Sequence, residues 1–443
     1  MFGRCELLWS QNICAMRIRS KEQPASAGEI ERIIEFGARS GERESRKRLL
    51  ERLECSCYLA KGQPERALKA RDRLLAQYQK DGLVLFLGAG VSLGSGIPSW
   101  NSLIEDVLQQ VGIGDYDTVK RAFPSLLTQF ELAGLRAGGQ KAFAEILYDC
   151  LYEQPGFKHL KSLLKSIPRG REEQPKWSQW DDLRKELAKN ETLRDVGDLL
   201  VLDDSEKRTL MRNPQIHAVL TVNADNLLEL YCLAKTSGKH RLVTMVDRAS
   251  VGDHPDATPV YHLHGTLDAR DENFRRTDSP CVGDNLQEIT DDLLPRLVFR
   301  ESEYYETIAK PASFVNHTPQ SYFQRLNVLF IGTSLDDLNI RRWLYSSFQE
   351  RVEQRTKYLR ELHWKFYKDA KSEAKLESVR HFWLRSKKEE AISCERAKWV
   401  DLVMSELGVQ VVWCDDLCDM RRCIRELREN GRVPEFGRRA VPR

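Results

Sequence analysis

Short apolar runs recur along the chain and predict buried β-strands. The clearest run, residues 83–87 (Leu-Val-Leu-Phe-Leu), ends at a glycine-rich turn. A strand that is apolar on both faces is typical of a central parallel strand covered by helices. Further strand signals occur at residues 218–222, 242–246, 260–263, 328–332 and 409–413.

Between these runs, apolar residues fall at intervals of three and four, which predicts helices. The spacing from residue 29 to residue 80 predicts helices that dock on the main domain or on a partner, and residues 112–213 predict a large helical insertion. Residues 350–407 are highly charged and are predicted to be helical, and Asp336 and Asp337 offer N-cap oxygens to a helix through Ile340.

Strands that alternate with helices indicate the α/β class, here a doubly wound, Rossmann-like parallel sheet with the helical insertion and an N-terminal helical segment. In such sheets the ligand binds beyond the carboxyl ends of the strands. We therefore expect an N-terminal helical extension at residues 1–80, a catalytic α/β domain at 81–430 and a basic tail at 431–443.

Composition narrows the class of protein. With 443 residues, 41% apolar, 30% charged and 9% aromatic, the chain excludes fibrous and wholly disordered proteins. The net charge of +3 leaves nucleic-acid binding undecided. We find no apolar run of about 18 residues and no convincing signal peptide, so we expect a cytoplasmic protein without membrane contact. The 11 cysteines lack metal-ligand spacing, so we expect reduced thiols and no metal.

The turn after the first strand carries the strongest local motif, Gly88-Ala89-Gly90-Val91-Ser92. Glycines at such a turn let backbone amides approach a phosphate, although glycines that serve only packing are a common alternative. The chain has no GxxxxGK[ST], and Leu93 stands where GxGxxG requires its third glycine. ATPase-type binding and hydride transfer are therefore disfavoured.

Four segments, in order, resemble the motifs of sirtuins. They are GAGVS…SGIPSW at residues 88–100, TVNADNL at 221–227, VYHLHG at 260–265 and LFIGTSL at 329–335. Each segment lies at the carboxyl end of a predicted strand. The resemblance implies that NAD binds here as the substrate. It assigns NAD contacts to Gly88, Ala89, Gly90, Ser92, Ile97, Pro98, Trp100, Gly332, Thr333 and Ser334.

Asn223, Asp225 and His264 are the candidate catalytic residues. Asn223 can orient water beneath the ribose carbon, and His264 can act as a general base. By the resemblance, Asp225 lies in the nicotinamide pocket and accepts from the carboxamide. Alternatives remain for each: Asn223 and Asp225 form an Asx turn, and His264 is a hydrogen-bonded structural histidine. His262 alternates with His264, so both rings cannot face one pocket.

Departures from the sirtuin pattern indicate which reaction to expect. Deacylating sirtuins carry a four-cysteine zinc ribbon after the HG histidine, and residues 268–301 contain only Cys281. The family's GIPDFR segment reads GIPSWN at residues 96–101. This pattern resembles divergent sirtuin-like NAD hydrolases of bacterial anti-phage defence, which also share a segment like Tyr304-Tyr305, although an aromatic pair more often belongs to the core.

That resemblance implies an NAD-depleting effector that is activated by assembly. We expect a homo-oligomer, with a sensor protein or a partner ATPase as the trigger. Two other functions stay open. One is a zinc-free deacylase or ADP-ribosyltransferase, and the other is a catalytically silent scaffold that senses NAD.

Overall fold

The computed structural model describes residues 65–167, 176–202, 215–238, 242–246, 257–270, 297–363, 370–388 and 392–430. Most of the predicted N-terminal extension, the basic tail and Cys281 lie outside the described residues. The first described element is helix α4 (Glu65–Asp81). Its residues Ala70, Leu74 and Tyr78 are buried in the same core as β1, and Arg71 forms an ion pair with Asp419 at 3.1 Å.

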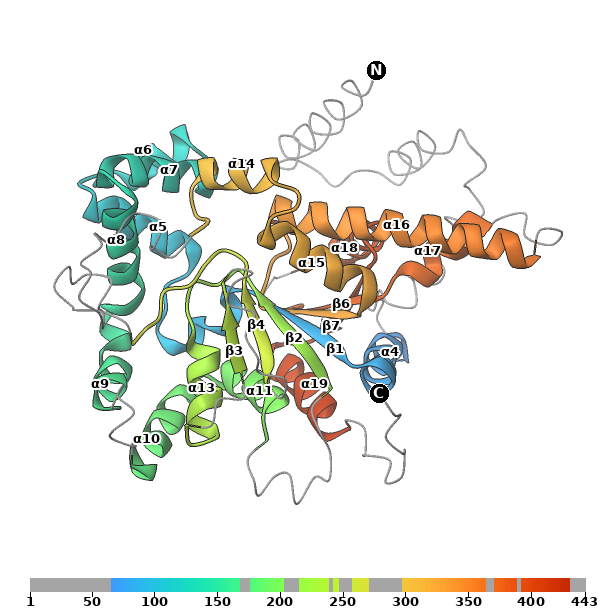
Figure 1. Cartoon of the computed structure of the whole chain (residues 1–443), viewed down its shortest axis with the longest axis horizontal. Helices are drawn as coiled ribbons and strands as arrows, with labels where there is room; N and C mark the ends of the chain where they lie inside the picture. Colours follow the sequence, from blue (N-terminus) through green and yellow to red (C-terminus); the bar gives the residue numbers. More distant parts are fainter. Residues whose placement is uncertain are drawn as a thin grey trace, which may run out of the picture. The chain divides into compact units, whose positions relative to one another are not determined.

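A seven-stranded, fully parallel sheet forms the centre of the molecule (Figure 1). Its order is β3-β4-β2-β1-β5-β6-β7. The chain places β2, β3 and β4 on one side of β1 and then crosses to the other side with β5, which makes β1 and β5 the switch point. This confirms the predicted α/β fold. The strands are β1 (Leu83–Leu87), β2 (Ile216–Thr221), β3 (Leu242–Met245), β4 (Thr258–His262), β5 (Val328–Ile331), β6 (His381–Ser386) and β7 (Val409–Cys414).

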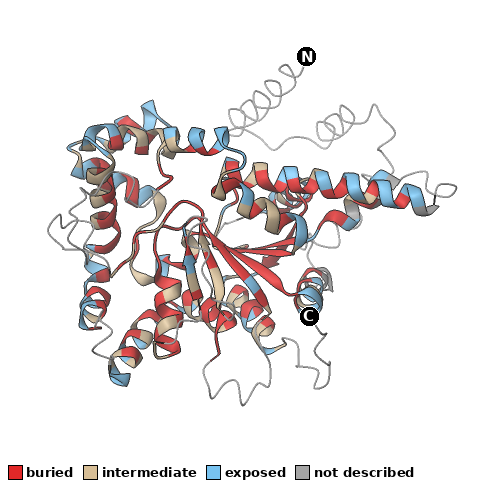
Figure 2. Ribbon diagram, viewed as in Figure 1, coloured by how far each residue is buried: buried red, intermediate tan, exposed pale blue. Residues whose placement is uncertain are grey.

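Strand β1 separates two apolar cores. Leu83, Leu85 and Leu87 pack into one core, and Val84 and Phe86 pack into the other. All five side chains are buried because successive residues of a strand point to opposite faces and both faces are covered (Figure 2). The sequence pattern of an uninterrupted apolar run therefore has the expected cause.

Helices cover both faces of the sheet (Figure 1). The described residues between β1 and β2 form helices: α5 (Trp100–Gln110), α6 (Tyr116–Ala122), α7 (Leu126–Ala137), α8 (Gln140–Tyr152), α9 (Lys158–Ser166), α10 (Trp177–Leu187) and α11 (Glu191–Leu200). The other helices described after β2 are α13 (Leu227–Lys235), α14 (Glu301–Ala309), α15 (Phe314–Arg325), α16 (Leu338–His363), α17 (Ala370–Ser378), α18 (Cys394–Ser405) and α19 (Leu417–Glu429). In the part of the chain that the structure describes, no helix has the length and apolar character needed to cross a membrane.

The prediction that charged helices fill residues 350–407 was wrong at β6. Residues 381–386 form a buried strand that pairs with both β5 and β7. Charged residues on either side, such as Arg380 and Arg385, hid the short apolar run Phe382-Trp383-Leu384. A run of three apolar or aromatic residues is enough for this strand because β5 and β7 on either side supply its hydrogen bonds.

Candidate active site at the carboxyl ends of the central strands

The strand register brings the four motif segments to one edge of the sheet. Leu87 pairs with Thr221 on one side and with Ile331 on the other, and Thr221 pairs in turn with His262. Neighbouring strands lie about 5 Å apart, so residues that follow these paired positions are close in space. The glycine turn, the Asn223 segment, the His264 segment and the turn at residue 332 therefore share the carboxyl edge.

The turns after β1 and β5 interlock through their glycines. The amide of Gly90 donates to the carbonyl of Gly332 at 2.9 Å. A Cβ on Gly88 would lie 2.5 Å from the Gly332 carbonyl oxygen, and a Cβ on Gly332 would lie 2.7 Å from the Val91 nitrogen. Gly332 also has a φ of +68°, which favours glycine. The two turns therefore require glycine at these positions for close packing, while the predicted contacts of these glycines with NAD stay a prediction.

Two amides of the glycine turn donate to carbonyls within the turn itself, in addition to the Gly90 amide, which donates to Gly332. Two short 3₁₀ turns, η1 (Ala89–Val91) and η2 (Leu93–Ser95), follow β1. The amides of Val91 and Ser92 donate to the carbonyls of Gly88 and Ala89 at 3.1 and 2.9 Å. Helix α5 begins only at Trp100. In this geometry the amides of residues 90–92 are not directed at a ligand, in contrast to a phosphate-binding loop.

Asn223 is held in place through its amide nitrogen and keeps its amide oxygen free. The Nδ2 group donates to the Gly88 carbonyl at 3.1 Å and to Ser92 Oγ at 3.4 Å. The Oδ1 atom is buried and has no hydrogen-bond partner among the described residues. Since the Gly88 carbonyl can only accept, the amide orientation is determined, and an acceptor atom is left for a ligand.

Asp225 lies beside Asn223 and shares Ser92 with it. Ser92 Oγ donates to Asp225 Oδ1 at 2.8 Å, and the Leu227 amide donates to the same oxygen at 3.2 Å. The second contact closes an Asx turn, so that alternative describes Asp225 and not the Asn223 side chain. Burial raises the pKa of Asp225, although both hydrogen bonds act in the opposite direction.

His264 is a buried ring with an unused nitrogen. The side chain is 2% exposed, and its Nε2 atom has no hydrogen-bond partner in the described part of the chain. The ring packs edge to face against Tyr304, with 5.3 Å between the centroids. Burial lowers the pKa of His264, and the negative charge of Asp337 opposes this shift. The ring is therefore neutral at pH 7 and can accept a proton.

His262 is the histidine with a structural role. Its Nδ1–H group donates to the Asn223 carbonyl at 3.0 Å, and its Nε2–H group donates to Glu229 at 2.7 Å. Both partners are acceptors, so the arrangement suits the doubly protonated ring. Burial lowers the pKa of His262, but Glu229 and the Asn223 carbonyl outweigh burial and raise it. As expected from the alternation, His262 and His264 face different surroundings.

The segment after the glycine turn packs into the protein. Trp100 lies 5.2 Å from the Phe299 ring and 5.9 Å from the Phe130 ring, so these three residues form an aromatic cluster. Ile97 is buried in the same core, whereas Pro98 is half-buried. The structure thus shows packing partners for Trp100 and Ile97, while their predicted contacts with NAD stay a prediction.

The polar side chains of the turn after β5 are less buried than Asn223 and His264. Thr333 is half-buried, and its carbonyl accepts from Trp383 Nε1 at 2.9 Å. Ser334 is exposed, and its Oγ accepts from the Asp336 amide at 3.3 Å. Asp337 Oδ1 accepts from the Asn339 amide at 2.8 Å, which confirms the predicted N-cap of α16.

Sequence reasoning did not assign two groups that brace the site from the helices. Asn190 caps α11 and also donates from Nδ2 to the Val91 carbonyl at 2.8 Å and to Ser95 Oγ at 2.9 Å. Tyr152 of α8 donates to the Leu267 carbonyl at 2.6 Å. An Asn before an amphipathic helix was visible as a cap signal, but its contact with a turn 99 residues away was not.

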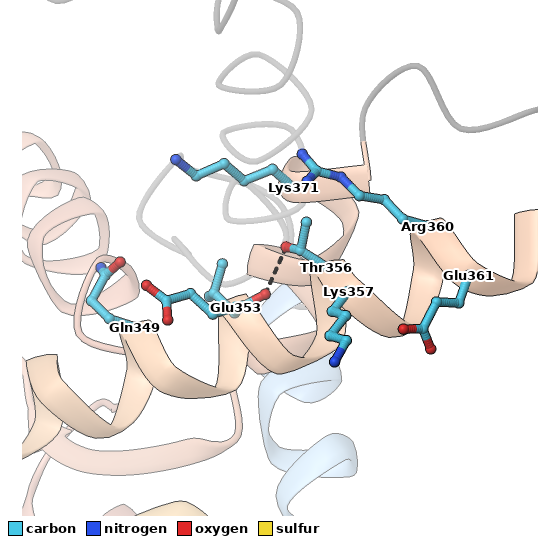
Figure 3. A pocket seen from close by; sticks show the side chains of 8 residues that line it. Gln349, Glu353, Thr356, Lys357, Arg360, Glu361 and Lys371 are labelled. Atoms are coloured by element: carbon cyan, nitrogen blue, oxygen red, sulfur yellow. Dashed lines mark hydrogen bonds between the residues drawn. The ribbon is translucent and has the colours of Figure 1, made fainter. Parts of the chain in front are cut away.

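A separate hollow of about 440 Å³ lies between α16 and α17 and is lined by Gln349, Val352, Glu353, Thr356, Lys357, Arg360, Glu361 and Lys371 (Figure 3). Its lining mixes acidic and basic side chains, and Thr356 donates to the Val352 carbonyl at 2.6 Å. None of the predicted site residues lines it. The described residues also contain no group of three or more His, Cys, Asp or Glu side chains that could hold a metal ion.

Comparison with known protein families gives a match that covers part of this site. The family model of the SIR2-like domain matches residues 217–392. This span contains Asn223, Asp225, His264 and the turn at residue 332, and it begins after the glycine turn. A search of curated proteins gives no match. The similarity to the SIR2-like domain points to NAD-related chemistry in general.

Proposed function

We propose that this chain is an NAD hydrolase that cleaves the nicotinamide–ribose bond and releases nicotinamide and ADP-ribose. The observation that carries the proposal is a pair of buried polar atoms, Asn223 Oδ1 and His264 Nε2, that have no partner among the described residues. In the proposal the neutral His264 ring carries its proton on Nδ1, so both atoms act as acceptors. Buried polar atoms are nearly always hydrogen-bonded, and leaving one unpaired costs about 1–3 kcal/mol. A ligand that brings hydrogen-bond donors removes this cost.

The two acceptors suit water and a ribose. They follow the neighbouring strands β2 and β4, and each stands two residues beyond the paired positions Thr221 and His262. Water or a ribose hydroxyl can donate to both atoms. An alkyl chain could not satisfy them, since it carries no hydrogen-bond donor.

Asp225 fits the nicotinamide carboxamide. The hydrogen bonds that it accepts from the described residues go to Oδ1, which leaves Oδ2 available for the carboxamide N–H. Ser92 links this carboxyl group to Asn223. The hydroxyl of Ser92 thus holds both Asp225, which binds the nicotinamide, and Asn223, which orients the attacking water. The resemblance to sirtuins assigns the same pocket to Asp225.

The reaction balances with these residues. Water attacks the ribose carbon, the carbon–nitrogen bond breaks, and its electron pair leaves with neutral nicotinamide. One proton of the water passes to His264 Nε2 and then to solvent. Burial lowers the pKa of His264, which keeps the ring neutral and ready to accept that proton. Asn223 Oδ1 accepts the other hydrogen of the water and so directs its lone pair.

For the adenosine half of NAD we propose contacts with Thr333 and Ser334, whose turn lies next to the glycine turn. The amides of residues 90–92 are already used, so we assign no phosphate contact to them. In this proposal the glycine turn forms a wall of the site, and the residues after β2 and β4 carry out the reaction.

The decisive test incubates the purified chain with NAD, with and without an acyl-lysine peptide. Release of nicotinamide and ADP-ribose without peptide supports hydrolysis. Turnover that requires the peptide supports deacylation or transfer instead. Binding of NAD without turnover, measured by calorimetry across a range of protein concentrations, supports a silent scaffold and contradicts the proposal.

We further propose, on the resemblance to defence effectors, that self-assembly or a partner such as an ATPase raises hydrolysis well above the low basal rate of the isolated chain. An enzyme that freely depleted NAD would kill its own cell, so activity must be low until assembly. Turnover per chain should rise with protein concentration together with the sedimentation coefficient. Strong hydrolysis by a dilute monomer contradicts this regulation and leaves the assignment of the reaction intact.

A further inference from the structure

Tyr304 reaches the candidate base from a different part of the chain. It lies on α14, whereas His264 follows β4, and the two rings meet edge to face. The Tyr304 side chain is 8% exposed, and its hydroxyl donates to Asp337 Oδ2. The adjacent Tyr305 is 61% exposed and donates to Glu301 on its own helix. Of the two adjacent tyrosines, only Tyr304 contacts the site.

Asp337 holds the Tyr304 hydroxyl at a fixed point. Its Oδ1 atom accepts from the amides of Asn339 and Ile340 at 2.8 and 3.1 Å, at the start of α16. The carboxylate therefore cannot turn without uncapping the helix, and its Oδ2 atom is aimed at Tyr304. The helix end thus determines where the phenol ring lies.

Helix α14 is fixed at its N-terminal end by the helical insertion. Thr128 of α7 donates to Glu301 at 2.8 Å, and Glu131 of α7 accepts from the amide and the hydroxyl of Ser302 at 3.0 and 2.8 Å. Glu303 Oε2 accepts from the Arg300 amide at 2.8 Å and completes the first turn. Tyr304 is therefore held by two elements besides its own helix.

We propose, resting on the function proposed above, that Tyr304 and Asp337 are positioning residues that fix the plane of the His264 ring for proton transfer. Neither residue is required to touch NAD. The Tyr304 ring restricts rotation of the imidazole, which has no hydrogen bond at Nε2 to hold it. The carboxylate of Asp337 restricts the tyrosine.

The same pair sets the electrostatic surroundings of the ring. Among the described residues, the titratable groups that face His264 are Tyr304 from α14 and Asp337 from the turn before α16. Burial lowers the pKa of His264, and the charge of Asp337 raises it. Removing that charge should lower the pKa further.

Three variants test the pair. Tyr304→Phe removes only the hydroxyl, and Asp337→Asn removes the charge but keeps a good N-cap residue, so both should fold. Tyr305→Phe is the matched control. Loss of a well-oriented base costs turnover more than binding, so we expect kcat to fall about tenfold in Tyr304→Phe with KM for NAD changed by less than about twofold. Tyr305→Phe should match the wild type.

A second readout does not require activity. The full chain labelled with ¹³C-histidine gives a titration of each ring in NMR spectra, and His264→Asn identifies the signal of residue 264. We expect this signal to shift in Tyr304→Phe, and its titration to move to lower pH in Asp337→Asn. The acidic limb of kcat/KM should move in the same direction. Tyr305→Phe should change neither.

The outcomes separate the two proposals. If the wild type does not hydrolyse NAD, the proposed function fails, and the histidine titration still decides whether the pair acts on His264. If the wild type is active but Tyr304→Phe and Tyr305→Phe give equal kcat and an unchanged signal for residue 264, the positioning role is overturned.

Discussion

The two halves of the strand-end site differ in how their polar atoms are satisfied. After β1 and β5, the turns bond to each other, and the glycines Gly88, Gly90 and Gly332 leave no room for a side chain. After β2 and β4, Asn223 and His264 keep buried acceptor atoms without partners in the described residues. The turns after β1 and β5 thus form the self-satisfied half of the site. The ends of β2 and β4 form the half whose hydrogen bonds are incomplete.

The difference shows that the carboxyl edge of one parallel sheet can serve two purposes. Interlocked turns stabilise the fold and define the shape of the site, because their hydrogen bonds and contacts are already made. Unpaired buried acceptors reduce stability, and a ligand that donates hydrogen bonds to them offsets this cost. Variants of the first half should therefore affect stability, and variants of the second half should affect chemistry.

The largest effect is expected at His264. His264→Phe keeps an aromatic ring against Tyr304 but removes the unpaired Nε2, so NAD hydrolysis should fall by about 10²–10⁴-fold while the free energy of unfolding stays equal or rises by about 1 kcal/mol. Steady-state kinetics and urea unfolding measure the two quantities. His317→Phe, on the exposed side of α15, is the control. A large loss of stability in His264→Phe would break the comparison.

The next largest effect is expected for the ion pair between His262 of β4 and Glu229 of α13. Glu229→Ala leaves His262 without its carboxylate, and removing one partner of a buried pair costs about 3 kcal/mol. The folded pKa of His262 is raised, so the pair stabilises the protein below the unfolded pKa of about 6.5 and loses this effect as pH rises through the folded pKa.

Urea unfolding at several pH values tests this sign. The difference between wild type and Glu229→Ala should be largest at about pH 6 and should shrink as the pH rises. Glu105→Ala, an exposed position of α5, should change the free energy of unfolding by less than about 0.5 kcal/mol. A difference that grows with pH would show that His262 is not protonated in the folded chain.

A smaller effect is expected in the self-satisfied half. Gly332→Ala combines a positive φ with a Cβ 2.7 Å from the Val91 nitrogen, and we expect a loss of about 2 kcal/mol in the free energy of unfolding. Gly114→Ala, where a Cβ meets nothing within 4 Å, is the matched control. Equal melting temperatures for the two variants would show that the turns do not interlock in solution.

The smallest effect is expected at Asn190 and separates its role as a helix cap from its contact with the glycine turn. Asn190→Ala and Asp115→Ala each remove an N-cap side chain, and the lost cap alone should cost about 1 kcal/mol in each variant. Only Asn190 also bonds to the glycine turn, through the Val91 carbonyl. We therefore expect KM for NAD to rise in Asn190→Ala alone. The same KM in both variants would limit Asn190 to its capping role.

Much of the architecture could be predicted from local pattern. The run at residues 83–87 reads correctly as a central strand because both of its faces are covered, and Asp337 reads correctly as a cap because the cap bond is made within its own segment. Strand β6 was missed since its short apolar run lies between charged segments. Its pairing partners, β5 and β7, supply what the local pattern lacks.

The candidate site shows the same division. Motif order predicts that Asn223 and His264 belong to one site. The packing of Trp100 against Phe130 and Phe299, and the interlocking of Gly88 with Gly332, depend on contacts between distant segments. A glycine that makes room for another backbone and a glycine that makes room for a phosphate look alike in a sequence, because neither has a side chain to distinguish them.

The sequence by itself determined the class of fold, the strand ends that carry the polar motifs and the alternation that separates His262 from His264. These follow from periodicity and from bonds between residues near one another in the chain. Only the tertiary structure decided which polar atoms are already paired and which are left for a ligand. That distinction arises where Tyr304, Asp337, Asn190 and Glu229 meet the strand ends, because a hydrogen bond between remote segments depends on how the whole chain packs.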